Sequence, residues 1–177
     1  MEEQGWLKDV VSGKSCDIQM RCNQIWAVSM PFTMLSPEQE RRVVDAVGRW
    51  LYTPCGLRTL APWDPEFQPR YHGGQLTRDM AYHQGTVWPY PLGAYYLAYL
   101  KTRGNTAAAR KEVRRLLEPL EASLREGCAG QLPEVYDGAA PGRSKGCFAQ
   151  AWSVGELLRV YEILEHSGSA ARKENHP

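Results

Sequence analysis

The lengths of the connections between helical segments constrain the fold more than any other feature of this sequence. Apolar residues recur at helical spacing in five segments, at about 23–32, 36–52, 92–104, 106–124 and 148–164. A few residues join the first segment to the second and the third to the fourth. The other two connections, about 56–86 and about 127–147, are long enough to be functional loops. Alternate connections of an up-and-down helical array lie at one end, so both long loops and the segment before the first helix should line one rim.

Several helix boundaries can also be predicted. Residues 36–39 form a capping box with proline at the first helical position. Asn105 or Thr106 should cap the fourth helix, and Pro119 should kink or restart it. Strand signals are weak throughout, and residues 6–11 are the only candidate. We therefore predict an all-α chain with five or six helices.

The composition and charge exclude several classes of protein. The net charge is +1, so no basic field points to a nucleic-acid partner. No apolar run approaches the roughly 18 residues that a membrane span needs. The five cysteines are odd in number and form no C-x-x-C pair, which favours reduced thiols in a cytoplasmic protein over a zinc site. Neither His72 nor His83 lies in a metal-binding motif, and no metal or other cofactor is expected. No serine occupies a G-x-S-x-G turn, which disfavours the nucleophile of an α/β-hydrolase.

The C-terminal end differs from the rest of the chain in composition. Residues 167–177 contain almost no apolar side chains that a core could bury. We therefore expect one domain over residues 1–166, followed by a disordered polar tail over residues 167–177.

The first long loop ends in a run of polar and aromatic residues, 78–89, that leads directly into a helix. A sugar pocket requires such residues, because carboxylates and amides bridge adjacent hydroxyl groups while an aromatic ring lies against the sugar face. The same residues also suit a polar loop that satisfies helix-end amides around buried aromatic side chains. The residues alone leave both interpretations open.

Carboxylates in the second long loop are candidates for catalysis. Glycoside hydrolysis needs two carboxyl groups on opposite sides of the scissile bond. Glu134 and Asp137 are only three residues apart, so they are poorly placed as opposite partners, although one of them suits half of such a pair. The alternative is that both are solvated loop acids. At the entry to the first helix, Arg21, Asn23 and Gln24 suit either the binding of hydroxyl groups or helix capping.

Four longer stretches occur in a fixed order along the chain. They are D-x-x-x-R-C-N-Q-I-W-A from Asp17; L-S-P-E-Q from Leu35; T-P-x-G-L-R-T-L from Thr53, continued by R-D-x-A-Y-H-Q-G-T-V-W-P from Arg78; and E-V-Y-D-G from Glu134, followed by G-C-x-A-Q-A-W-S-V from Gly146. Together they resemble the amylo-α-1,6-glucosidase domain of glycogen debranching enzymes, especially the bacterial and archaeal type. The resemblance covers about residues 5–165, and its last two stretches are the most specific.

The resemblance implies a six-hairpin α/α toroid that hydrolyses, with inversion, the single glucosyl stub at an α-1,6 branch of glycogen or a limit dextrin. By position in the motif, it implies that Glu134 is the general base that activates water. It implies substrate-binding roles for Arg21, Asn23, Gln24, Asp79, Tyr82, His83, Gln84 and Trp88, and supporting roles for Asp137 and Trp152. The sequence departs from the family pattern at Cys22, usually a proline, and at Tyr90-Pro91, and neither position carries an assigned role.

The chain is short for a complete toroid, because twelve helices with their connections need well over about 200 residues. In the family, the general acid lies upstream of the region that these motifs cover, and Glu2, Glu3, Asp9 and Glu66 are not obvious replacements. We therefore expect a C-terminal portion that needs the upstream half of the domain as its partner and is weakly active or inactive alone. The alternatives are a non-catalytic glucan-binding remnant or partner subunit, and another toroid enzyme of the trehalase-like or disaccharide-phosphorylase-like kind.

Overall fold

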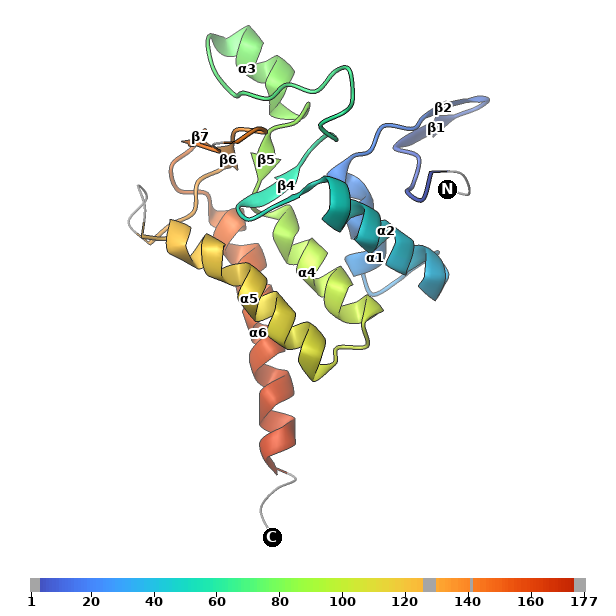
Figure 1. Cartoon of the computed structure of the whole chain (residues 1–177), viewed down its shortest axis with the longest axis vertical. Helices are drawn as coiled ribbons and strands as arrows, with labels where there is room; N and C mark the ends of the chain where they lie inside the picture. Colours follow the sequence, from blue (N-terminus) through green and yellow to red (C-terminus); the bar gives the residue numbers. More distant parts are fainter. Residues whose placement is uncertain (1–3, 126–129, 141, 174–177) are drawn as a thin grey trace.

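The computed structural model describes residues 4–125, 130–140 and 142–173, with helices and short strands interleaved along the chain (Figure 1). The helices are a 3-10 helix η1 (Cys22–Ile25) and the α-helices α1 (Trp26–Ser29), α2 (Pro37–Trp50), α3 (Gln75–Tyr82), α4 (Pro91–Thr102), α5 (Ala107–Ser123) and α6 (Ala151–Lys173). The strands are β1 (Val10–Ser12), β2 (Ser15–Asp17), β3 (Tyr52–Thr53), β4 (Gly56–Arg58), β5 (Val87–Trp88), β6 (Val135–Tyr136) and β7 (Ser144–Lys145).

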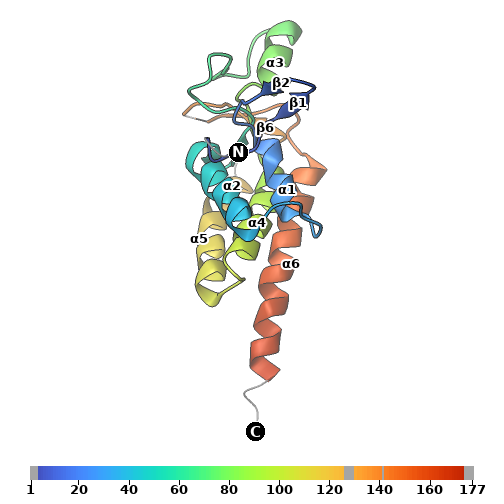
Figure 2. The same cartoon turned by 90° about the vertical axis from the view of Figure 1, so that its right-hand side faces the viewer.

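Helix α4 is the centre of the hydrophobic core. It contacts η1, α1, α2, α5 and α6, and residues on all of its sides are buried. Its sequence explains this position, because a helix that is apolar all round is stable only inside a domain. The neighbouring helices each turn one apolar stripe toward it, such as Val43, Val44 and Val47 of α2. Figures 1 and 2 show α4 surrounded by α1, α2, α5 and α6.

A five-stranded antiparallel sheet lies at one end of this helical core, in the order β3-β4-β5-β6-β7. Leu57 of β4 pairs with Trp88 of β5, Val87 pairs with Tyr136 of β6, and Val135 pairs with Lys145 of β7. A separate two-stranded hairpin, β1-β2, lies near the N-terminal end of the described chain.

The prediction of an all-α chain belonging to an α/α toroid is therefore wrong, and the fold is mixed α/β. The sequence failed to predict the strands because they are short: each has only two or three residues. The alternation of apolar and polar side chains that signals a strand needs at least about four residues to become visible. Cross-strand pairing between distant segments, which the sequence pattern does not encode, forms this sheet.

The helical segments match their predicted positions more closely. Ser36 caps α2 in a reciprocal capping box with Gln39, and Thr106 caps α5, as the sequence indicated. The segment 23–32 is divided between η1 and α1, and α5 continues through Pro119 without ending there. The helix missed by the sequence analysis is α3, which lies within the first long loop and whose N-cap residue makes no side-chain cap.

The long connections meet at the sheet end of the molecule. Arg21 pairs with Leu60 through an isolated bridge, and the Arg21 guanidinium donates to the carbonyl of His83 at 2.8 Å. The first long loop supplies β4, α3 and β5, while the second supplies β6 and β7. The segment before the first helix and both long loops thus share one region, as the alternation of connection lengths predicted.

The C-terminal helix extends beyond the domain boundary expected at residue 166. The backbone of α6 is helical to Lys173, and residues 174–177 of the expected tail lie outside the described part of the chain. Among the helices of the described residues, none combines the length and apolar character needed to cross a bilayer.

The crossing of α4 and α6 yields a test of the core. A Cβ atom added to Gly93 of α4 would lie 2.7 Å from the Cβ and the carbonyl oxygen of Glu156 in α6. We expect Gly93→Ala to force the helices apart and to lower the free energy of unfolding by about 1–3 kcal/mol. Urea denaturation followed by circular dichroism measures this change.

Gly155 of α6 provides the matched control, because a Cβ added there meets no described atom within 4 Å. Gly155→Ala should leave stability unchanged or raise it by about 0.5–1 kcal/mol through helix propensity alone. Equal stability of the Gly93→Ala and wild-type proteins would contradict the close packing of α4 against α6.

Candidate active site

Glu134 lies immediately before β6, and three contacts with the surrounding chain fix its position. Its backbone N–H donates to the carbonyl of Cys147 at 2.8 Å, and the Cys147 N–H donates to Glu134 Oε2 at 2.7 Å. The hydroxyl of Tyr82, the last residue of α3, donates to the other carboxylate oxygen, Oε1. Both oxygens of this half-buried carboxylate are therefore oriented by donors from separate parts of the chain.

Gly146 gives the carboxylate its space. Its φ of +66° lies in the left-handed region that side chains other than glycine rarely adopt. A Cβ atom at this position would also collide with Glu134 Oε2. Glycine is thus required at position 146 for two reasons: the backbone of the turn after β7 and the position of the Glu134 side chain.

The hydroxyl of Tyr82 is a persistent donor to this carboxylate. Burial raises the pKa of Tyr82 above its ordinary value, and the hydrogen bond and negative charge of Glu134 raise it further. A raised pKa keeps the phenol protonated through the neutral range. Tyr82 therefore donates to Glu134 without adding charge to the site.

Tyr82 also joins Glu134 to a cluster of aromatic rings. The Tyr82 ring lies 4.7 Å from the Trp88 ring and 4.8 Å from the His83 ring, while His83 stacks on Trp88 at 5.5 Å. Tyr90 stacks on Trp152 at 4.6 Å with an interplanar angle of 22°. The stacked and edge-on arrangements contribute energy beyond area burial, so the cluster is a rigid wall for the site.

A cavity of about 280 Å³ lies against this wall. Its lining comes from the segment around η1, from β5 and from the start of α4: Arg21, Cys22, Asn23, Thr59, His83, Trp88, Tyr90 and Pro91. Arg21, Asn23 and His83 bring polar groups to this lining, and Trp88 and Tyr90 bring aromatic rings. This combination of donors, acceptors and rings is of the kind that binds a sugar.

A second and larger cavity, of about 520 Å³, shares Arg21 and His83 with the first. Its other lining residues are Glu66, Gln68, Asp79, Met80 and Gln84. Arg21 donates to Gln84 Oε1 at 2.7 Å, and the Gln84 amide donates to Glu66 Oε2 at 3.1 Å. The pKa of His83 is lowered mainly by burial and to a smaller extent by the positive charge of Arg21. Its imidazole is therefore neutral near pH 7.

The structure places the sequence-predicted site residues in four groups. Arg21, Asn23, Asp79, His83, Gln84 and Trp88 line one or both cavities. Tyr82 and Glu134 line neither cavity, but the Tyr82 ring contacts two residues of the cavity wall and its hydroxyl contacts Glu134. Trp152, which is 47% exposed, extends the wall by stacking on Tyr90.

Gln24 and Asp137 are occupied by contacts within the protein. The Gln24 amide donates to the carbonyl of Arg21 at 2.8 Å, and its oxygen accepts from the Leu7 N–H at 3.1 Å. The buried Asp137 carboxylate accepts from the Tyr71 N–H at 2.9 Å and from Arg70 at 3.3 Å. Gln24 therefore anchors the N-terminal segment, and Asp137 anchors the first long loop to β6.

Several residues of the site received no role from the sequence. Glu66, which the sequence offered only as a poor replacement for the general acid, lines the second cavity, and Thr59 and Tyr90 line the first. The backbone N–H of Cys147 holds Glu134, and no side-chain pattern could reveal that contact. Groups of three or more side chains able to hold a metal ion are absent from the described residues.

Comparisons with known proteins add an independent line of evidence. The model of the family described as "Amylo-alpha-1,6-glucosidase" matches residues 1–159. A protein of Saccharomyces cerevisiae named "Glycogen debranching enzyme" is 31% identical over 167 residues, which cover 84% of this chain and 11% of the yeast protein. The chain thus spans about a tenth of the length of this relative.

The contact between Tyr82 and Glu134 predicts a measurable titration. Glu134→Gln removes a negative charge that opposes ionisation of the phenol, so the pKa of Tyr82 should fall. It should stay above the ordinary tyrosine value of about 10, because burial is the largest cause of the shift. Nuclear magnetic resonance of tyrosines labelled with ¹³C at Cζ follows this titration, and Tyr82→Phe assigns the signal.

Glu118→Gln, a charge-matched substitution on the exposed face of α5, is the control and should leave the Tyr82 titration unchanged. If Glu134→Gln leaves the pKa of Tyr82 where it is in the wild-type protein, the two side chains do not interact as described.

Proposed function

Because this chain belongs to the amylo-alpha-1,6-glucosidase family, we propose that it carries the general base of an enzyme that hydrolyses single α-1,6-linked glucosyl branches of glycogen. The base is Glu134, and the reaction proceeds with inversion at the anomeric carbon. The observation that carries this proposal is the seating of the Glu134 carboxylate between the Tyr82 hydroxyl and the Cys147 N–H. The name of the yeast relative supports glycogen as the substrate.

The hydrogen bonds of Glu134 suit a base. Each carboxylate oxygen has two lone pairs, and among the described residues each accepts one hydrogen bond, which leaves a position for water. Neutral donors orient the carboxylate and stabilise its negative charge without neutralising it. In an inverting hydrolysis, such a carboxylate removes a proton from the water molecule that attacks the anomeric carbon.

The two cavities suit the sugar. Tyr90, beside the nearly buried Trp88, offers apolar surface to a glucosyl ring, while Arg21, Asn23 and His83 supply donors and acceptors for its hydroxyl groups. Arg21 and His83 line both cavities, so sugar units in the two cavities would contact the same two side chains. We propose that the terminal glucosyl unit and the chain that carries it occupy these cavities.

We also propose that the general acid lies in a part of the enzyme outside this segment. Inverting enzymes place the acid about 6.5–9.5 Å from the base, across the scissile bond. The carboxylates that line these two cavities are Glu66 and Asp79, and Glu66 accepts hydrogen bonds from Gln19 and Gln84. Since the chain corresponds to 11% of the yeast relative, we propose that an upstream region provides the acid and that the isolated chain is weakly active or inactive.

A second candidate function is glucan binding without catalysis. Its support is the exposure of apolar side chains on and just before α6, where Phe148 is 75% exposed and Leu158 is 62% exposed. Such residues suit a surface that another part of a larger protein covers.

In either case we propose a cytoplasmic setting, which the free thiols of Cys16, Cys22 and Cys147 support.

Glucose release from an α-1,6-branched limit dextrin tests the proposal. The chain alone should release little glucose, and addition of the upstream region of the parent protein should restore release. In the restored enzyme, Glu134→Gln should lower kcat by about 10²–10⁴-fold, because an amide cannot accept the proton from water.

Glu118→Gln on α5 should leave the activity unchanged. An active Glu134→Gln enzyme would refute the assignment of the base. A restored wild-type protein that binds the dextrin in calorimetry without releasing glucose would instead establish the second candidate function.

A further inference from the structure

A third cavity, of about 390 Å³, is lined by Arg70, His72, Asp137, Arg143 and Lys145. Three of these five residues are permanently cationic at neutral pH, and only one is acidic. The whole chain has a net charge of only +1, so the excess of positive charge in this lining is a local feature and not that of a basic protein. None of the roles proposed above uses this cavity.

Asp137 neutralises only one of the three cations. Its carboxylate is 5% exposed and accepts from Arg70 at 3.3 Å and from the Tyr71 N–H at 2.9 Å. Arg70 also donates to the carbonyls of Ala139 and Ala140, at 3.2 and 3.0 Å. This pair holds the wall of the cavity together and leaves two positive charges in excess.

The excess positive charge belongs to Arg143, which directly precedes β7, and to Lys145, which is on β7. Among residues 4–125, 130–140 and 142–173, no hydrogen bond or ion pair engages either side chain. Lys145 is paired with Val135, and the Asp137 N–H donates to the carbonyl of Arg143 at 3.1 Å. Residues two apart on a strand share a face, so this register places both cations beside Asp137 on one face of the β6-β7 hairpin.

Glu134 lies on the other face of the same hairpin. It precedes Val135, so strand alternation directs its side chain away from the face that carries Asp137 and Lys145. Glu134 and Asp137 are three residues apart, which is about 10 Å along a strand. An occupant of the third cavity would therefore not displace substrate from Glu134.

We propose that this cavity binds a phosphate group, either free or carried on a sugar as a phosphomonoester. A phosphate dianion matches the two excess charges, and its oxygens can accept from the fork of Arg143, the ammonium of Lys145 and the imidazole of His72. The volume falls within the range of small-molecule pockets and exceeds what a phosphate alone fills, so a sugar ring can enter with it. The proposal concerns binding and is independent of the role of Glu134.

Isothermal titration calorimetry at low ionic strength tests this site with three probes: inorganic phosphate, glucose 6-phosphate and glucose. Phosphate and glucose 6-phosphate should bind saturably to one site, and glucose should not compete with either. Arg143→Gln combined with Lys145→Gln should weaken both affinities about tenfold or more, since each change removes a charged hydrogen-bond donor. Both side chains are at least partly exposed, so the variant should fold, which circular dichroism checks.

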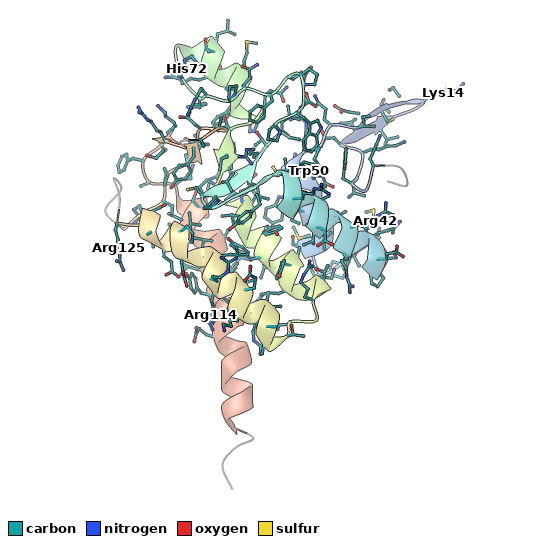
Figure 3. All side chains as sticks on the ribbon, viewed as in Figure 1. Lys14, Arg42, Trp50, His72, Arg114 and Arg125 are labelled. Atoms are coloured by element: carbon teal, nitrogen blue, oxygen red, sulfur yellow. The ribbon has the colours of Figure 1, made fainter. Side chains whose placement is uncertain are left out.

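The control is Arg41→Gln combined with Arg42→Gln, which removes the same charge from the exposed face of α2. Figure 3 shows Arg42 on α2, at the right of the view, and His72 beside α3, at the top. This variant should bind as the wild-type protein does. Equal weakening in both variants, or no binding of either phosphate probe at millimolar concentration, would overturn the proposal.

The two phosphate probes also distinguish the source of the group. Tighter binding of glucose 6-phosphate than of inorganic phosphate would identify a sugar-borne phosphate as the ligand. Equal affinity would identify the free anion, and both results support the site.

Discussion

Antiparallel pairing between β4, β5 and β6 ties the two long connections together at one end of α4, and the candidate site depends on it. Long loops carry backbone groups that must find hydrogen-bond partners, and this sheet supplies them. Thr59 reinforces the pairing, since its N–H and hydroxyl both donate to the carbonyl of Thr86 and its hydroxyl accepts from the Gly85 N–H. A side chain at Gly56 would collide with the carbonyl of Trp88, so the strands approach this closely only because that residue is glycine.

The position of Glu134 follows from this arrangement. The pairing of Val87 with Tyr136 sets β6 beside β5, and the pairing of Val135 with Lys145 brings the Cys147 N–H to the carboxylate. Tyr82 arrives from the other long connection, just before β5. The buried α4 anchors this assembly from below, because β5 leads directly into it. Rigid elements thus hold a carboxylate whose two oxygens receive donors from both loops, which is the preorganisation that acid–base chemistry requires.

The sequence predicts the helices well because their signals are local. The capping box at Ser36 and the apolar stripe of Val43, Val44 and Val47 need only their own segment. The sheet could not be predicted, because its strands of two or three residues are defined by their pairing partners in other segments. Helix α3 could not be predicted either, because it has no side-chain cap and its apolar residues Leu76 and Met80 are exposed. Six of the motif residues line the two cavities, and their roles toward a substrate stay predictions. The motifs did not reveal that Gln24 is occupied by the backbone, since a motif lists side chains without their partners.

We propose that Glu134 acts on water as a base and not on the sugar as a nucleophile. The configuration of the glucose first released from an α-1,6-branched limit dextrin tests this most directly, in a parent protein that contains this segment. Proton nuclear magnetic resonance of the anomeric signal, recorded before mutarotation, distinguishes the two products. Direct attack of water activated by Glu134 predicts β-glucose as the first product. Release of α-glucose first would contradict the account, because retention requires a second displacement that a base alone does not provide.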